Sequence, residues 1–380
     1  MTIIKNKETQ NIQYFGLVKT LLLVLFTFKS FPFIIEPRIW AEEGDVYLKD
    51  SILNGLNSIV HTHQGYYSII PSVTLYFASL FNFKFIPYFT LAVSLTFFIL
   101  LFLLIQNINN DKYDRNFKSI ITISFFVILN SIQEIFLNVI TLQFITPLIL
   151  YILSFYDFTK LSKFKFRFIL FIIAACTLNG PTSIFIVPLI ILKLIRSNRK
   201  SEAAFIALLL TICITSIFTT PPSDAQVSAT IRIKSNMVEI LNQMHHGKFG
   251  FIIIDNIYFI VIPIFLIFRN LINQDNLQIA ILTLVYGGFF QLTKAVGGGE
   301  RYSAIVYCLM VLAFTLLFLQ NRIAIFSICI VTTFYFGRGF LRTNYSYDKN
   351  IKPWSSEYMN LKSNGKAEIH PKGWYLSLKK

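Results

Sequence analysis

The chain has 380 residues, of which 54% are hydrophobic and only 14% are charged, and its mean hydropathy is +0.60. A soluble domain usually carries about a quarter charged residues, so an ordinary soluble protein is excluded, and the continuous apolar runs exclude a transmembrane barrel, whose strands alternate. The formal charge of +15 resides mostly in short loops between apolar runs, which indicates a polytopic α-helical membrane protein and no nucleic-acid partner.

The N-terminal segment carries Lys5 and Lys7 ahead of the first apolar run, at about 14–35. No small-residue cleavage site follows this run, so we expect a retained first span rather than a signal peptide. The positive-inside rule then places the N-terminus in the cytoplasm and residues 36–84 outside, which in a bacterium is the periplasm.

The segment RIWAEEGDVYLKD, residues 38–50, follows this first span directly. It places Glu42, Glu43 and Asp45 within four positions, and carboxylates just outside a span can act as a general base or bind a metal ion. Gly44 is expected to interrupt the path from the span into the next helix and to turn the carboxylates toward a cleft. A solvated acidic loop is the alternative interpretation.

The next apolar stretch, 66–83, has two possible placements. If it crossed the membrane before a further span at 85–106, the basic loops 107–118 and 158–167 would both lie outside, against the positive-inside rule. We therefore expect 66–83 to be an amphipathic helix in the outer interface. A helix at about 45–57 precedes it, so the first outer loop is expected to contain two interfacial helices.

Further polar residues fall in the expected outer loops. His61 and His63 form an H-x-H pair that, without a third ligand, is more typical of polar cleft lining than of a metal site. Glu134, Asn138 and Gln143 crowd the second outer loop, either as site residues or as ordinary helix-end polarity.

The remaining apolar runs complete a bundle of about 11 spans, with residues 1–337 as the membrane domain and 338–380 as a short outer tail that covers the cleft. The expected spans are about 14–35, 85–106, 119–132, 139–157, 168–179, 184–195, 203–219, 250–268, 277–291, 304–319 and 323–337. The NGPTS turn at 179–183 is expected to have a structural role. Four cysteines, all within apolar runs, predict neither disulfides nor a zinc site.

The sequence GGGERYS, residues 297–303, lies at an expected outer helix end. The glycines allow a close approach of a ligand to the backbone, Arg301 is suited to pair with a phosphate, and Tyr302 is suited to the headgroup level. An arginine that reaches to lipid headgroups is the alternative.

Several of these motifs together resemble the GT-C type of membrane glycosyltransferase, and in particular the bacterial O-antigen-modifying, serotype-converting glucosyltransferases. The resemblance rests on Trp40-Ala-Glu-Glu-Gly44, on Gly65, Tyr66 and Pro71 after an amphipathic helix, and on the Arg301-Tyr302 element. The position where that pattern has Asp holds Glu43, which leaves open whether Glu43, Glu42 or Asp45 is the base. The resemblance implies an all-α fold with two interfacial helices in the first periplasmic loop.

The resemblance further implies an inverting transfer of a sugar, with glucose the first choice, from a polyprenyl-phosphate donor to a periplasmic acceptor such as lipid-linked O-antigen. Glu43, Glu42 and Asp45 are then candidate catalytic residues, in that order, and the candidate substrate-binding residues are Arg301, Tyr302, Glu134, Asn138, His63 and Trp40. No cofactor is expected, although a carboxylate-rich loop leaves Mg²⁺ or Mn²⁺ open. The setting would be the bacterial inner membrane, with a donor-synthesising enzyme and a flippase in the same pathway. A polysaccharide polymerase, or a flippase or transporter for lipid-linked sugars, is the alternative.

Overall fold

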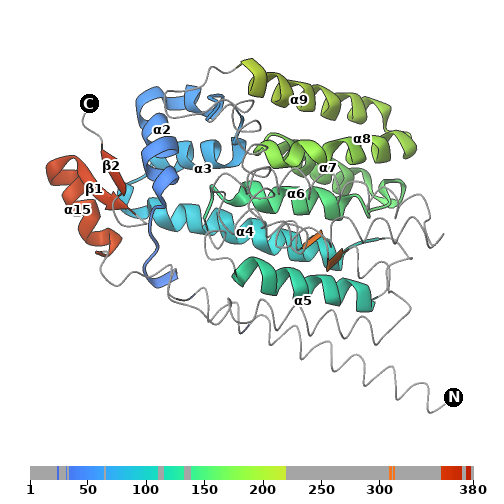
Figure 1. Cartoon of the computed structure of the whole chain (residues 1–380), viewed down its shortest axis with the longest axis horizontal. Helices are drawn as coiled ribbons and strands as arrows, with labels where there is room; N and C mark the ends of the chain where they lie inside the picture. The colour runs from blue at the N-terminus through green and yellow to red at the C-terminus, as the bar shows by residue number, and fades with distance from the viewer. Residues whose placement is uncertain are drawn as a thin grey trace, which may run out of the picture.

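The structure is a computed structural model. It describes residues 34–63, 66–109, 115–131, 138–219, 352–369 and 374–377, together with positions 24, 31, 308–309 and 311–312. This part of the chain is mostly helical (Figure 1). Most of the first expected span, and nearly all of the four expected between 250 and 337, lie outside the described residues.

The described helices follow the expected order. The long elements are α3 (Ile69–Ser79), α4 (Ile86–Gln106), α5 (Arg115–Ser131), α6 (Leu142–Leu153), α7 (Lys163–Thr177), α8 (Val187–Arg196) and α9 (Lys200–Thr219). Short turns η1 (Glu43–Leu48), α2 (Lys49–Asn54), η2 (Gly55–Ile59), η3 (Phe83–Phe85), η5 (Phe158–Lys160) and η6 (Pro181–Phe185) connect or precede them. Both helices expected in the first loop are therefore confirmed as helices, although the second is shorter than 66–83.

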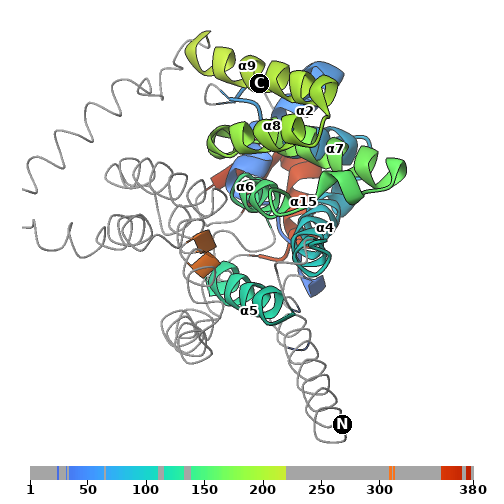
Figure 2. The ribbon, with the colours of Figure 1, turned by 90° about the vertical axis from the view of Figure 1, so that its right-hand side faces the viewer.

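One described helix, Phe83–Gln106, is long and apolar enough to cross a membrane by length and composition, with 24 residues and a mean hydropathy of 2.5. α6 is apolar on every side and is buried along almost its whole length, as expected of a helix surrounded by other helices. It contacts α4, α7 and α8. Figures 1 and 2 both show α6 near the centre, with α5 beyond α4 on one side and α9 beyond α8 on the other.

α6 contains a proline that leaves one helix carbonyl without its usual donor, and a neighbouring turn supplies that donor. Pro147 has no N–H to donate to the carbonyl of Gln143, four residues earlier. The Thr182 hydroxyl, in η6, donates to that same Gln143 carbonyl at 2.5 Å. The turn NGPTS, which the sequence identified as structural, therefore satisfies a backbone group that the helix proline leaves open.

The same turn also pairs with the first loop. The N–H of Gly180 donates to the Tyr67 carbonyl at 2.7 Å, and the N–H of Ile69 donates to the Leu178 carbonyl at 3.2 Å. The fully buried Asn179 accepts from the N–H of Ile70 at 3.3 Å. Residues more than 100 positions apart are thus held together through backbone groups that would otherwise be unsatisfied.

The basic connections meet at the other end of the bundle. Asn109 and Asp157 exchange two hydrogen bonds, 2.8 and 3.1 Å long, which join the end of α4 to the connection after α6. Lys193, near the end of α8, donates to the Ser154 carbonyl at 2.6 Å. At the opposite end of α4, the indole N–H of Trp354 donates to the Phe83 carbonyl beside the first loop. The ends of α4 and α6 therefore lie together, and the start of α4 lies beside the tail at the opposite end.

The tail requires one correction to the all-α expectation. It forms α15 (Trp354–Asn364) and then an antiparallel hairpin of β1 (Lys366–Ile369) and β2 (Trp374–Ser377). Gly365 ends the helix in a left-handed conformation, with φ of +69°. Strand alternation then buries Ala367, Ile369 and Leu376 on one face. The helical pattern expected throughout fails here because the tail has this two-residue period.

Replacing Gly180 with alanine should destabilise the fold. Its φ of +87° disfavours an L side chain, at about 1–3 kcal/mol. An added Cβ would also meet the Gln143 Cβ at 2.8 Å, and overpacking adds about 1–3 kcal/mol. Gly55→Ala is the matched control, because φ is +56° there but nothing lies within 4 Å. Thermal unfolding of the purified protein in detergent should show a larger loss for Gly180→Ala; equal losses would contradict the proposed contact.

Candidate functional site

The acidic turn is helical rather than broken. Residues 43–48 form the π-helical turn η1, which continues directly into α2. π-helical turns are rare and are frequent at functional sites. The expectation that Gly44 interrupts the chain is wrong: its N–H donates to the Trp40 carbonyl at 3.0 Å within the helix. Glycine is instead required by space, because an added Cβ would meet the Ile369 Cδ1 at 2.7 Å and the Ile39 Cγ2 at 3.1 Å.

Glu43 is almost completely buried, with 1% of its surface exposed. Its Oε2 accepts from the N–H of Trp40 at 3.0 Å, and its Oε1 accepts from the N–H of Val139 at 2.7 Å. The second bond joins the acidic turn to the segment just before α6, across 96 positions of sequence. Glu43 therefore holds together two segments that the sequence identified separately.

The protonated and ionised forms of the Glu43 carboxyl group are close in free energy near neutral pH. Burial raises its pKa to about 7, while the N–H groups of Trp40 and Val139 lower it and the nearby charge of Glu42 raises it further. Burial disfavours the carboxylate, and two hydrogen-bond donors favour it. The result is a carboxyl group that changes protonation near neutral pH.

The other two candidate acids lie in different surroundings. The Asp45 side chain is 41% exposed and forms a 3.6 Å ion pair with Lys49, one helical turn later. Such exposed pairs contribute little to stability. Glu42 is half-buried, and within the described part of the chain it has neither a hydrogen bond nor an ion pair. Of the three acids, Glu42 is thus the one that combines partial enclosure with an uncommitted carboxylate.

Trp40 and Asn138 both lie beside Glu43, as their assignment to one site predicts. Trp40 is half-buried and contributes its backbone N–H. Asn138 is 4% exposed, and its Oδ1 accepts from the N–H of Ile140 at 2.9 Å, which orders the turn that presents Val139. The Nδ2 of Asn138 is buried and has no hydrogen-bond partner among the described residues.

His63 belongs to a neighbouring cluster with an acid that sequence reasoning missed. Asp50, on α2, lies 3.0 Å from the Nδ1 of His61 and 3.3 Å from the Nε2 of His63. The His63 ring also packs edge-on against the Tyr47 ring, with centroids 4.4 Å apart. Burial lowers the pKa of His63, and the charge of Asp50 opposes that shift. The signal that was available is the H-x-H pair after an amphipathic helix that carries an acid.

The side chains of this histidine cluster contact one another directly. The described residues contain no group of three or more His, Cys, Asp or Glu side chains suited to a metal ion. The Asp50 oxygens contact the imidazole of His61 directly, so the atoms that would bind a metal already bind each other.

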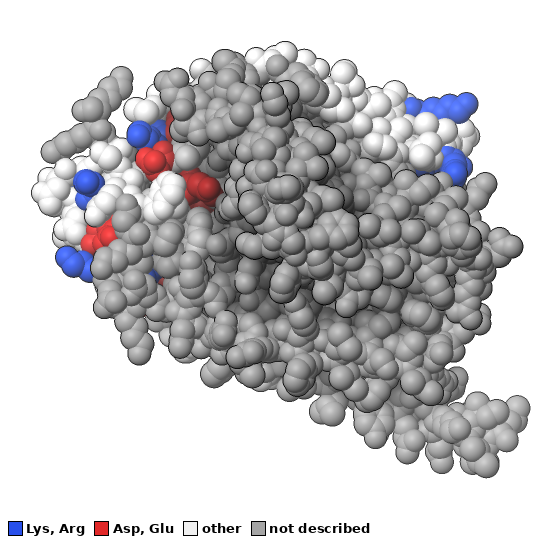
Figure 3. Space-filling model, viewed as in Figure 1, with Lys and Arg blue, Asp and Glu red and all other residues white. Residues whose placement is uncertain are grey.

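The C-terminal tail covers the acidic turn from the outside. β2 contacts η1, and Ile369 of β1 lies against Gly44. The buried Glu357 accepts from the N–H of Glu368 at 2.7 Å and so fixes the hairpin to α15. Figure 3 shows acidic side chains at the end of the molecule where the tail and α2 lie, and basic side chains both there and at the far end.

Three of the predicted site residues, Arg301, Tyr302 and Glu134, lie outside the described residues. The structure brings Glu42, Glu43, Trp40 and Asn138 together, and it places His63 next to them through Tyr47, which lies on η1. Comparison with known proteins found no family model, no curated protein and no solved structure that matches the chain.

The raised pKa of Glu43 predicts a pH dependence of stability. The unfolded carboxyl titrates near 4.5 and the folded one near 7, so the folded state binds more protons between these values. Stability from this group is therefore lost as the pH rises from about 4.5 to about 7. The lowered pKa of His63 acts with the opposite sign in part of this range. Unfolding should consequently be measured for wild type and Glu43→Gln at each pH, and the advantage of wild type should shrink as the pH rises. A constant difference would contradict the shifted pKa.

Contact between the tail and the turn predicts an energetic coupling. Gly44→Ala should destabilise the protein by about 1–3 kcal/mol through overpacking against Ile369. Ile369→Val removes the nearest atom, so the double variant should be more stable than the sum of the two single losses. Thermal unfolding of the four proteins measures this coupling, and strictly additive losses would contradict it.

Proposed function

We propose that the chain is an inverting membrane glycosyltransferase that moves a sugar, glucose as first choice, from a polyprenyl-phosphate donor to a periplasmic glycan acceptor. The observation that carries the proposal is the pair Glu42–Glu43 on the helix after the first apolar segment. One carboxylate is anchored by two backbone N–H groups, and the adjacent one is half-buried and uncommitted. Two carboxyl groups in contrasting environments are a recurrent basis for assigning separate roles.

We assign the base to Glu42 and a positioning role to Glu43. Glu43 has one backbone N–H bonded to each oxygen and almost no exposed surface, so an acceptor hydroxyl could reach it only if the residues that cover it moved. Glu42 follows directly from the same anchored helix. A base must lie within hydrogen-bond reach of the hydroxyl that it deprotonates, and the anchoring of Glu43 limits the movement of its neighbour.

The reaction then proceeds as a single displacement. Glu42 takes the proton from the acceptor hydroxyl as that oxygen attacks the anomeric carbon. The bond from this carbon to the donor phosphate breaks, and the polyprenyl phosphate leaves with the electron pair from the opposite face, which inverts the configuration. Arg301 and Tyr302 are proposed to bind the departing phosphate at the membrane surface, because guanidinium groups pair well with phosphate oxygens. No step requires a cofactor or a metal ion.

The proposal includes a setting in the bacterial inner membrane, with about 11 spans, a cytoplasmic N-terminus and the acidic turn in the periplasm. The apolar helix Phe83–Gln106 and the gathering of the basic connections at the end opposite the first loop support this orientation. The donor would be supplied by an enzyme that charges the polyprenyl phosphate and by a flippase that moves it across the membrane.

Substitution of Glu42 tests the assignment. Glu42→Gln should reduce transfer by at least about 100-fold, the usual contribution of a general base, with normal membrane insertion and thermal stability. Asp45→Asn is the matched control, because it removes an acid from the same helix that pairs with Lys49 instead, and it should keep near-normal transfer. Transfer is measured by composition and linkage analysis of surface glycans from cells with and without the gene, complemented by each variant.

The possible outcomes distinguish a wrong choice of the catalytic base from a wrong choice of the protein's function. Normal transfer by Glu42→Gln, with loss in Glu43→Gln, would move the base to Glu43. Removal of the gene could leave the composition and linkages of the surface glycans unchanged while altering polymer length or retaining lipid-linked precursors. This result would favour the polymerase or the flippase over the transferase.

A further inference from the structure

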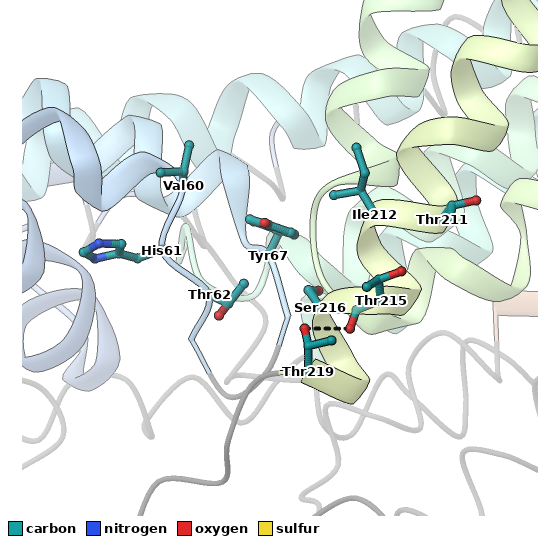
Figure 4. Close-up of a pocket in the computed structure, with 9 residues that line it drawn as sticks. All are labelled: Val60, His61, Thr62, Tyr67, Thr211, Ile212, Thr215, Ser216 and Thr219. Carbon is teal, nitrogen blue, oxygen red and sulfur yellow. Dashed lines mark hydrogen bonds between the residues drawn. The ribbon is translucent and has the colours of Figure 1, made fainter.

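We infer that a pocket between the first loop and α9 binds a neutral saccharide. This pocket has a volume of about 470 Å³, within the range of small-molecule sites. The first loop contributes residues 60–62 and Tyr67 to one wall, and the last two turns of α9 form the other (Figure 4). The identification of this saccharide as the acceptor rests on the proposed transferase activity. The binding of a saccharide in the pocket does not depend on that activity.

The described lining is mostly uncharged. It contains no Lys, Arg, Asp or Glu side chain, and His61 is its one imidazole. Thr62, Tyr67 and four hydroxyl residues of α9 supply most of its polar surface. A neutral ligand that combines hydroxyl groups with apolar faces, as a sugar ring does, matches this mixed lining.

The hydroxyls of α9 are arranged as acceptors. Thr211 donates its proton to the Ala207 carbonyl at 2.9 Å, and Thr219 donates to the Thr215 carbonyl at 2.9 Å. Ser216 likewise donates to the Cys213 carbonyl at 2.8 Å. The protons of Thr211 and Thr219 are thereby committed within the helix, while their oxygens keep lone pairs for an incoming donor. Sugar hydroxyls are such donors, and the ring of Tyr67, between the two walls in Figure 4, offers an apolar face to a sugar ring.

The wall contributed by the first loop is fixed by contacts with residues that do not line the pocket. Figure 4 shows the His61 side chain pointing away from α9, and on that side its Nδ1 lies 3.0 Å from Asp50. On the other flank, the Tyr67 carbonyl accepts from the N–H of Gly180. These contacts fix one wall of the pocket and connect it to the same loop that carries Glu42.

The exposed surface of α9 suits a lipid-linked glycan. Phe205 and Leu208 expose apolar surface before the pocket, and from Thr211 onward hydroxyl side chains lie among the exposed Ile212 and Ile214. A glycan on a membrane anchor would place its lipid against the apolar part and its first sugars against the hydroxyl-lined part. The proposed topology puts that hydroxyl-lined end on the same outer side as the acidic turn.

Saccharide binding without turnover is the direct test. The full-length protein in lipid nanodiscs is titrated, with no donor present, with short oligosaccharides released from the surface glycans of the source cell. Saturation-transfer NMR should detect binding by wild type. The double variant Thr211→Val/Thr219→Val keeps the branched shape but removes two acceptors, so its affinity should fall about tenfold. Tyr67→Leu should weaken binding independently.

The matched control is Thr96→Val on α4, where the hydroxyl donates to the Ala92 carbonyl at 2.8 Å in the same way but lies outside the pocket. It should bind like wild type. The inference is overturned if wild type gives no saccharide signal, if the double variant binds as wild type does, or if inorganic phosphate displaces the saccharide. Glu42→Gln should still bind, so a failed transferase assignment and a failed pocket give different results.

Discussion

The Glu43 carboxylate and the two backbone N–H groups that it accepts are the contact on which the rest of the outer end depends. One bond fixes the start of the helix through Trp40, and the other attaches this helix to the second loop through Val139. An N–H group left without a partner in such a buried place costs about 1–3 kcal/mol. A single side chain thus determines where the acidic turn sits relative to α6. Because Glu42 is adjacent to Glu43 in the same helix, this contact also restricts the position of Glu42.

Two neighbouring glutamates are therefore chemically distinct although the sequence presents them as equivalent. Burial sets Glu43 apart, with a pKa near 7, whereas Glu42 remains half-buried on the same helix. Motif position favoured Glu43 as the base because it stands where a related pattern has aspartate. The geometry shows that Glu43 holds the loop, and the proposed function assigns the contact with the substrate to its neighbour. The order of the two assignments is a matter of local environment, which spacing does not encode.

Much of the helical order was predictable, because long apolar runs separated by basic loops carry a strong signal over many residues. The placement of 66–83 in the outer interface followed from charge alone and stays a prediction, because the pairing of Asn109 with Asp157 fits both placements of this segment. Contacts between distant polar residues were not predictable. The sequence indicates only that Asp50 is an acid on a surface helix, whereas the structure places His61 and His63 against it. The sequence likewise indicates only a turn at Asn179, whereas the structure shows its bond to Ile70. The roles of Gly44 and Pro147 depend on Ile369 and Thr182, which no local pattern connects to them.

The hairpin that rests on Gly44 has a consequence for how the protein is made. Residues 354–369 are synthesised more than 300 positions after the turn that they cover. During synthesis, Gly44 and its buried neighbours stay uncovered until this late segment arrives and Trp354 reaches the Phe83 carbonyl. Enclosure of the acidic turn is therefore among the last contacts that the chain can form, because the segment that provides it is made after the helices that carry the turn.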